Sequence, residues 1–185
     1  ENIICFNYQG ASPALMGACA ERNIGLAFLS PHGRFLARVS GLVRGNVLLR
    51  KKQVRVSENE AQSMPFAASF LLGKIYNSRK VIERALGKAS AFLKETLLAI
   101  PQCKRTAEMM AFEGSAGKIY FGVFDHLILQ QKEDFRFVER SRRPPLDRVN
   151  ALLSFLYALL TNETISALEA VGLDPYVGFL HADRP

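Results

Sequence analysis

The sequence predicts an α+β protein that is mainly helical, with a small strand-rich domain followed by an all-helical domain. Up to about residue 56, apolar residues occur in short runs separated by turn residues, which is typical of strands. From about residue 62 they recur at every third or fourth position, which is typical of helices packed on a core. The 185 residues are enough for two small domains that share an interface.

The first part of the chain is expected to hold short strands and one helix. Ser12 followed by Pro13 is typical of a capped helix start, and this helix should end near Asn23. A turn at 30–33, with the sequence Ser-Pro-His-Gly, predicts a hairpin between two of the strands. The expected strands are residues 2–8, 25–29, 34–39 and 43–49.

The domain boundary is placed where the apolar period changes. Residues 1–56 form the predicted β-rich domain, the polar stretch 57–63 its linker, and residues 64–185 the helical domain. Within the latter, a helix at 146–161 carries an apolar stripe and a polar stripe, and is expected to be central and buried. The polar stripe predicts either an internal hydrogen-bond network or a wet site; its members are Asn150, Ser154, Tyr157 and Thr161.

Composition limits the classes of function. The net charge of +7, without a long basic tail, favours a nucleic-acid groove on a folded surface. Three widely spaced cysteines are expected to be reduced thiols of a cytosolic protein. The longest apolar run, 151–160, is about half of a bilayer span, so no membrane segment is expected. Motifs for dinucleotides, nucleotide triphosphates and serine hydrolases are absent.

Two segments concentrate basic residues. The first runs from Arg22 to Arg55 without an acidic residue, and either binds phosphates or is a solvated strand face. The second surrounds Pro144-Pro145, which hold the backbone extended, and its arginines either grip phosphates or pair with nearby acidic residues. The basic residues are Arg22, Arg34, Arg38, Arg44, Arg50, Lys51, Lys52 and Arg55 in the first segment, and Arg136, Arg140, Arg142, Arg143 and Arg148 in the second.

Glu113 and His181 are the candidate metal ligands. Glu113 flanks the apolar stripe of a predicted helix, beside the small residues Gly114 and Gly117, which is compatible with a metal ligand. The alternative is a Glu at the edge of the core that pairs with Lys or Arg, with helix packing explaining the glycines. A lone histidine such as His181 is usually a satisfied polar residue, and a metal would need further ligands. His32 and His126 are expected at the surface or against DNA.

An ordered set of segments resembles the CRISPR adaptation integrase and endonuclease family, especially its type I-C-like form. The segments span nearly the whole chain, and their order is more specific than any one of them. They are 28–35, 45–50, Glu113-Gly114 with Tyr120-Phe121, 142–147 with 149–154, and 167–169 with 172–175 and 178–181.

The resemblance implies a β-rich N-terminal domain whose first strands are missing and a helical catalytic domain whose C-terminal part is missing. It also implies a homodimer and a site for Mg²⁺ or Mn²⁺ made of a Glu, a His and an acidic residue. Glu113 matches the first ligand and His181 the second, both as catalytic residues, whereas Asp183 does not match the third. Residues are also expected to be omitted near Leu86-Gly87.

The implied activity is metal-dependent insertion of spacer DNA into a CRISPR array by transesterification, in the prokaryotic cytoplasm. Implied partners are double-stranded DNA with 3′ ends, CRISPR repeat DNA and the small ferredoxin-like CRISPR adaptation protein. The alternatives are a non-catalytic DNA-binding or architectural protein and a simple metal nuclease. The residues expected to bind DNA are Arg34, Arg38, Arg50, Lys51, Arg140, Arg142 and Arg143.

Overall fold

The computed structural model describes residues 2–42, 46–88 and 90–181. They form an α+β, mainly helical fold divided into two compact units. Unit 1 comprises Glu1–Gln53 and Ala151–Val177, and unit 2 comprises Val54–Asn150 and Gly178–Pro185. These units do not follow the predicted division at 57–63, because the chain returns to unit 1 after residue 150. Most of the predicted linker is helical, since residues 60–63 begin a long helix.

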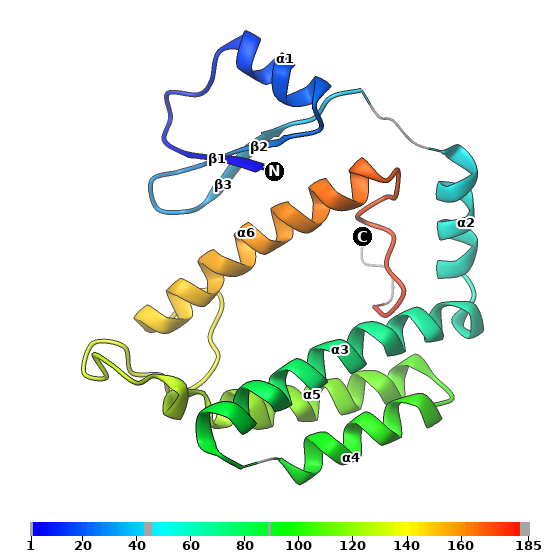
Figure 1. The fold of residues 1–185 in the computed structure, drawn as a ribbon, viewed down its shortest axis with the longest axis vertical. Coiled ribbons are helices and arrows are strands. Elements are labelled where there is room, and N and C mark those ends of the chain that lie inside the picture. Colours follow the sequence, from blue (N-terminus) through cyan, green and yellow to red (C-terminus); the bar gives the residue numbers. More distant parts are fainter. Residues whose placement is uncertain (1, 43–45, 89, 182–185) are drawn as a thin grey trace. The chain divides into compact units, whose positions relative to one another are not determined.

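Unit 1 contains a three-stranded sheet in the order β1-β2-β3 (Figure 1). Strand β1 (Asn2–Phe6) runs parallel to β2 (Gly25–Leu29), and helix α1 (Pro13–Glu21) connects them. Strand β3 (Phe35–Val39) is antiparallel to β2, with an irregular register at Phe28/Leu29. Three of the predicted strands are therefore confirmed.

The local signals at α1 and at the hairpin act as predicted. The Ser12 hydroxyl accepts a hydrogen bond from the Leu15 amide at 3.2 Å, and Pro13 is the first helical residue. In the hairpin the Gly33 amide donates to the Ser30 carbonyl at 2.9 Å. Gly33 has φ +80°, and a Cβ there would lie 2.7 Å from the Phe155 ring. Glycine is therefore required at this turn.

The predicted strand at 43–49 is wrong where the structure describes it. Helix α2 (Val47–Ser57) includes Val47 to Leu49, and residues 43–45 lie outside the described residues. The Asn46 side chain accepts a hydrogen bond from the Leu48 amide at 2.8 Å, as a residue before a helix often does. Lysine, arginine and leucine, all good helix formers, continue the segment.

Unit 2 is built on three helices that lie side by side in Figure 1: α3 (Glu60–Leu86), α4 (Ala91–Ala99) and α5 (Thr106–Gly122). The short 3₁₀ helices η1 (Ile100–Gln102) and η2 (Phe124–Leu127) follow α4 and α5. The apolar stripes of α3, α4 and α5 meet in one core, as the helical spacing of their apolar residues predicts. The buried residues of this core are Ala67, Leu71, Ile75, Ile82, Leu93, Ile100, Met109 and Ala116.

Helix α6 (Arg148–Ala170) is longer and less buried than predicted. Leu152 and Leu156 are each 49% exposed and Leu160 is 60% exposed. The helix turns other residues toward the sheet: the Phe155 ring lies 5.6 Å from the Phe6 ring, between centroids. By length and composition α6 could cross a membrane, and none of the tested window is buried. One such helix is weak evidence for a membrane span.

Two long segments of the predicted all-helical domain are not helical. Residues 128–147 form turns and extended chain, and so do residues 171–181. In unit 1, the buried side chain of Gln53 holds the second of these segments: it donates to the carbonyls of Asp174 and Val177 at 2.8 and 3.0 Å, and accepts from the Asp174 amide at 2.8 Å. Side-chain hydrogen bonds replace helical ones there.

Candidate functional site

Glu113 lies on α5 where this helix packs beside α3. Its side chain is 31% exposed, and its carboxylate forms an ion pair with the ammonium of Lys74 on α3. A Cβ at Gly114 or Gly117 would meet no heavy atom within 4 Å, so close packing does not account for these glycines. The structure therefore shows the paired Glu of the alternative but not the helix packing that this alternative gave for the glycines.

His181 is exposed and ends the described part of the chain. The two residues before it are anchored in unit 2. The Phe179 ring lies 5.0 Å from the Phe66 ring of α3, between centroids, and Leu180 packs against the helical core. His181 and Glu113 thus belong to the same unit, each next to a residue that contacts α3 or the core.

Within residues 2–42, 46–88 and 90–181 no three His, Cys, Asp or Glu side chains come close enough to hold a metal ion. Glu113 does fit one ligand position, because its half-buried carboxylate already attracts a cationic group, the Lys74 ammonium. His181 offers an imidazole side chain. Asp183 lies outside the described residues. Among the described residues, Glu113 and His181 thus remain individual candidate ligands.

The predicted phosphate-binding residues of unit 1 differ in availability. Arg34 at the hairpin and Lys51 on α2 are exposed. Arg38 on β3 forms an ion pair with Glu169 of α6, which partly neutralises it. Arg50 is half-buried, and its Nε has no hydrogen-bond partner among the described residues. Arg44 lies outside them.

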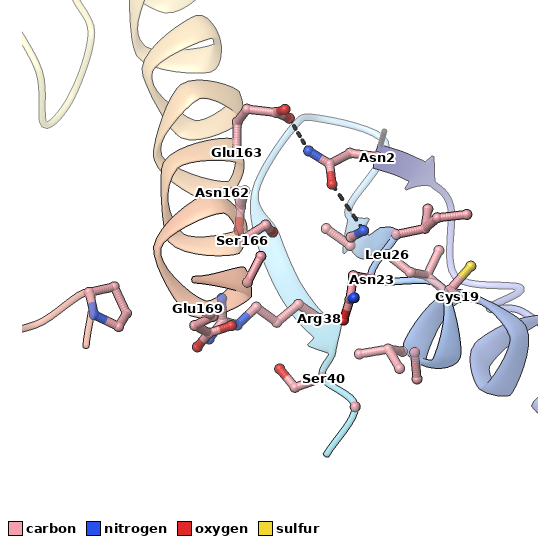
Figure 2. A pocket seen from close by; sticks show the side chains of 18 of the residues that line it. Asn2, Cys19, Asn23, Leu26, Arg38, Ser40, Asn162, Glu163, Ser166 and Glu169 are labelled. Carbon is pink, nitrogen blue, oxygen red and sulfur yellow. Dashed lines mark hydrogen bonds and ion pairs between the residues drawn. The ribbon is translucent and has the colours of Figure 1, made fainter. Parts of the chain in front are cut away.

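A cavity of about 320 Å³ in unit 1 lies between the sheet and α6 (Figure 2). Arg38 and Glu169 pair at its wall, and the Asn2 amide bonds both the Glu163 carboxylate and the Gly25 backbone amide. These contacts hold α6 against the sheet, while Arg38 Nη1 and Arg50 Nε in the cavity lining have no hydrogen-bond partner among the described residues. It contains neither Glu113 nor His181.

The second basic segment lies in unit 2. The Arg140 guanidinium donates to the Asn150 side chain at 2.8 Å, whereas Arg142 and Arg143 are exposed. Arg148 pairs with Asp134, as the alternative of neighbouring acidic residues predicts. Asn150 is fully buried, and sequence reasoning placed it in a polar stripe without identifying its partners. The signal was Asp147 three residues earlier, whose carboxylate caps the Asn150 amide at 2.7 Å.

The remaining candidates have ordinary surroundings. His32 and His126 are exposed, as expected of surface groups. Cys5, Cys19 and Cys103 are free thiols. Burial is the main cause that raises the pKa of the Cys103 thiol, and the nearby Glu108 adds to it.

The fold and the surface together define the class of protein: an α+β, mainly helical protein with exposed arginines. Such a positively charged surface attracts anionic polymers. The profile of the family described as "CRISPR associated protein Cas1" matches residues 1–185. The chain belongs to the Cas1 family, which confirms the resemblance found in its motifs.

Curated relatives agree with this assignment. The chain is 45% identical to "CRISPR-associated endonuclease Cas1 1" of Chlorobaculum tepidum, over 99% of this chain and 57% of the relative. It is 46% identical to "CRISPR-associated endonuclease Cas1 2" of Rhodospirillum rubrum, over 100% of this chain and 57% of the relative. The chain therefore spans somewhat more than half the length of these relatives.

Solved structures share the fold. A CAS1 protein from Thermotoga maritima matches with a TM-score of 0.81 at 23% identity, over 97% of this chain and 58% of that one. A casposase bound to an integration product matches with a TM-score of 0.83 at 23% identity, over 100% of this chain and 53% of that one. At such identities the likeness shows the α+β fold.

Proposed function

We propose that the whole protein is a divalent-metal-dependent DNA endonuclease and integrase that inserts spacer DNA into a CRISPR array by transesterification. The observation that carries this proposal is the family match over residues 1–185, which includes the half-buried Glu113. The names of the relatives as endonucleases and of a structural neighbour as a casposase bound to an integration product support it.

In this proposal Glu113 and His181 are ligands of Mg²⁺ or Mn²⁺, together with an acidic residue from the part of the family's length that this chain does not cover. The bound metal would polarise a phosphoryl oxygen and lower the pKa of the attacking hydroxyl. Lys74 must release Glu113 for this role. Its side chain is 54% exposed, so it can turn into solvent at little cost.

The reaction exchanges one phosphodiester for another. The 3′-hydroxyl of the spacer loses its proton, and its oxygen forms a bond to phosphorus at the repeat boundary. The bond from this phosphorus to the 3′-oxygen of the repeat strand breaks, and the leaving oxygen takes up a proton to become a hydroxyl. Exposed basic residues hold the two DNA backbones without reading bases. They are Arg34 and Lys51 in unit 1, and Arg142 and Arg143 in unit 2.

The proposed assembly is a homodimer in the prokaryotic cytoplasm, with spacer-precursor DNA, CRISPR repeat DNA and the small ferredoxin-like adaptation protein. A structural neighbour titled "Cas6-RT-Cas1--Cas2 complex", with a TM-score of 0.73 at 21% identity, supports a CRISPR-associated protein partner. Arg38 and Arg50 contribute less than the exposed basic residues, because one is paired and the other is half-buried.

The test replaces Glu113 by alanine in the whole protein and follows strand transfer of 3′-hydroxyl DNA into repeat DNA with Mg²⁺ or Mn²⁺. We expect cleavage and joining to be lost while DNA binding persists. Glu95→Ala, an exposed acidic residue of unit 2, is the control and should stay active. Unchanged joining by the Glu113 variant overturns the role of Glu113. Salt-sensitive binding by the unmodified protein without cut or joined products would instead indicate the architectural alternative.

A further inference from the structure

The side chain of Asn150 uses its full hydrogen-bonding capacity inside unit 2. It is 0% exposed. Its oxygen accepts from the Arg140 guanidinium at 2.8 Å and from the Ser141 amide at 2.9 Å. Its nitrogen donates to the Glu139 carbonyl at 2.8 Å and to the Asp147 carboxylate at 2.6 Å. An asparagine amide offers two donors and two acceptor positions, so none is left over.

These partners lie at the two ends of one irregular segment, residues 139–147. Glu139, Arg140 and Ser141 are at its start and Asp147 at its end, so a single buried amide joins both ends. The Ser141 hydroxyl adds a bond from the Leu146 amide at 2.9 Å. The segment has no helix or strand of its own, and these bonds join its two ends.

The middle of the segment carries Arg142 and Arg143, which are both exposed. Among the residues that the structure describes, neither makes an ion pair or a hydrogen bond. Neighbouring arginines differ, since Arg140 bonds Asn150 and Arg148 bonds Asp134. Two adjacent guanidinium groups are thus held out on a closed segment, with their donors open to an anion.

We propose that Asn150 is a positioning residue: by closing residues 139–147 it presents Arg142 and Arg143 in one arrangement for the DNA backbone. This inference rests on the proposed function. A segment that is already ordered loses less conformational freedom when it binds, and the gain appears as affinity. Asn150 itself is buried and touches no DNA.

The test is a cycle of variants in the whole protein: Asn150→Ala, Arg142→Ala with Arg143→Ala, and all three together. Binding of double-stranded DNA is measured by fluorescence anisotropy over a range of salt concentrations. We expect the arginine pair to lower the salt slope by about 1.8, for two phosphate contacts. Asn150→Ala should weaken binding roughly three- to tenfold, and should weaken it no further once both arginines are gone.

Controls separate positioning from general damage. Asn162→Ala removes the same residue type from α6, where the amide bonds the Ala158 carbonyl of the same helix, and should leave DNA affinity unchanged. Ser141→Ala removes one bond from the segment and should give a smaller loss of affinity, also absent without the arginines, even if Asn150→Ala fails to fold.

An equal loss with and without the arginines overturns the inference, and so does no loss on changing either Asn150 or Ser141. Absence of DNA binding by the unmodified protein would overturn the proposed function as well. If the unmodified protein integrates DNA normally but the Asn150 and Ser141 variants bind DNA as tightly as it does, the inference is overturned and the proposed function stands.

Discussion

The interactions inside each of the two compact units differ. In unit 2, helices that follow one another along the chain close a core of nearly inaccessible apolar side chains. In unit 1, residues far apart in sequence meet through polar contacts, such as Asn2 with Glu163 and Arg38 with Glu169. Unit 2 should therefore depend mainly on the volume of its core, whereas in unit 1 specific contacts between the sheet and α6 add to the burial of Cys19, Leu26, Ala27 and Leu29.

The largest effect is expected in the core of unit 2. Leu93 on α4 is 0% exposed, so Leu93→Ala should lower the free energy of unfolding by about 2–5 kcal/mol, through lost burial and an unfilled cavity. Denaturant unfolding followed by circular dichroism measures this. Leu98→Ala on the same helix is the control, because Leu98 is 68% exposed and its loss should change little. Similar values for both variants would contradict the assignment of the core.

Within unit 1, a glycine substitution in the hairpin tests the contact between the hairpin and α6. Gly33→Ala places a Cβ at φ +80° and 2.7 Å from the Phe155 ring, and should cost about 1–3 kcal/mol. Gly10→Ala is the matched control: it has φ +77° and nothing within 4 Å, so it meets the backbone penalty alone. The difference between the two free energies of unfolding measures the Phe155 contact, and no difference would argue against that contact.

The Lys74 and Glu113 pair should add little to stability. Both side chains are partly exposed, so Lys74→Ala is expected to change the free energy of unfolding by about 0–1 kcal/mol. Lys74→Arg, which keeps the charge, is the control. A loss above about 2 kcal/mol would mean that the pair is structural and that Glu113 is poorly placed to change partners.

The smallest effect concerns Glu60, whose carboxylate accepts from the Thr106 amide at 2.8 Å and hydroxyl at 2.7 Å. The hydrogen bond from the Thr106 amide is the main cause that lowers the Glu60 pKa below 4.5. The hydrogen bond from the Thr106 hydroxyl and the charge of Arg105 lower it further. A lowered pKa stabilises the fold above the unfolded-state pKa and loses this effect as pH falls through the folded-state pKa. The free energies of unfolding of Glu60→Gln and of the unmodified protein, measured in denaturant at several pH values, should therefore converge on acidification.

The sequence predicted those elements of the fold that depend on neighbouring residues. Ser12-Pro13 began α1 as expected, and the apolar period located the helices of unit 2. Val47 to Leu49 were predicted as a strand, because an apolar triplet does not distinguish a strand from a helix and Asn46 was not recognised as its cap. The polar turn residues between Ile128 and Asp147 were not weighed against the helical pattern around them.

The candidate site was predictable in its residue types and less so in its partners. The motif resemblance singled out Glu113 and His181, but the Lys74 pair joins residues 39 positions apart, and periodicity does not identify such a partner. Arg38 was predicted to bind DNA, and its pairing with Glu169 depends on where α6 lies against the sheet. Asn150 was placed in a polar stripe, while its four partners became visible in the folded segment.

Leu152, Leu156 and Leu160 follow one another at four-residue intervals on α6, and each leaves about half of its surface or more in water. Such a row makes the chain an amphiphile. Contact between apolar surfaces strengthens on warming and in sulfate, and urea weakens it. Self-association of the chain should therefore increase on warming and with sulfate, and decrease with urea. Cold, dilute, sulfate-free buffer is the medium in which single molecules should persist longest.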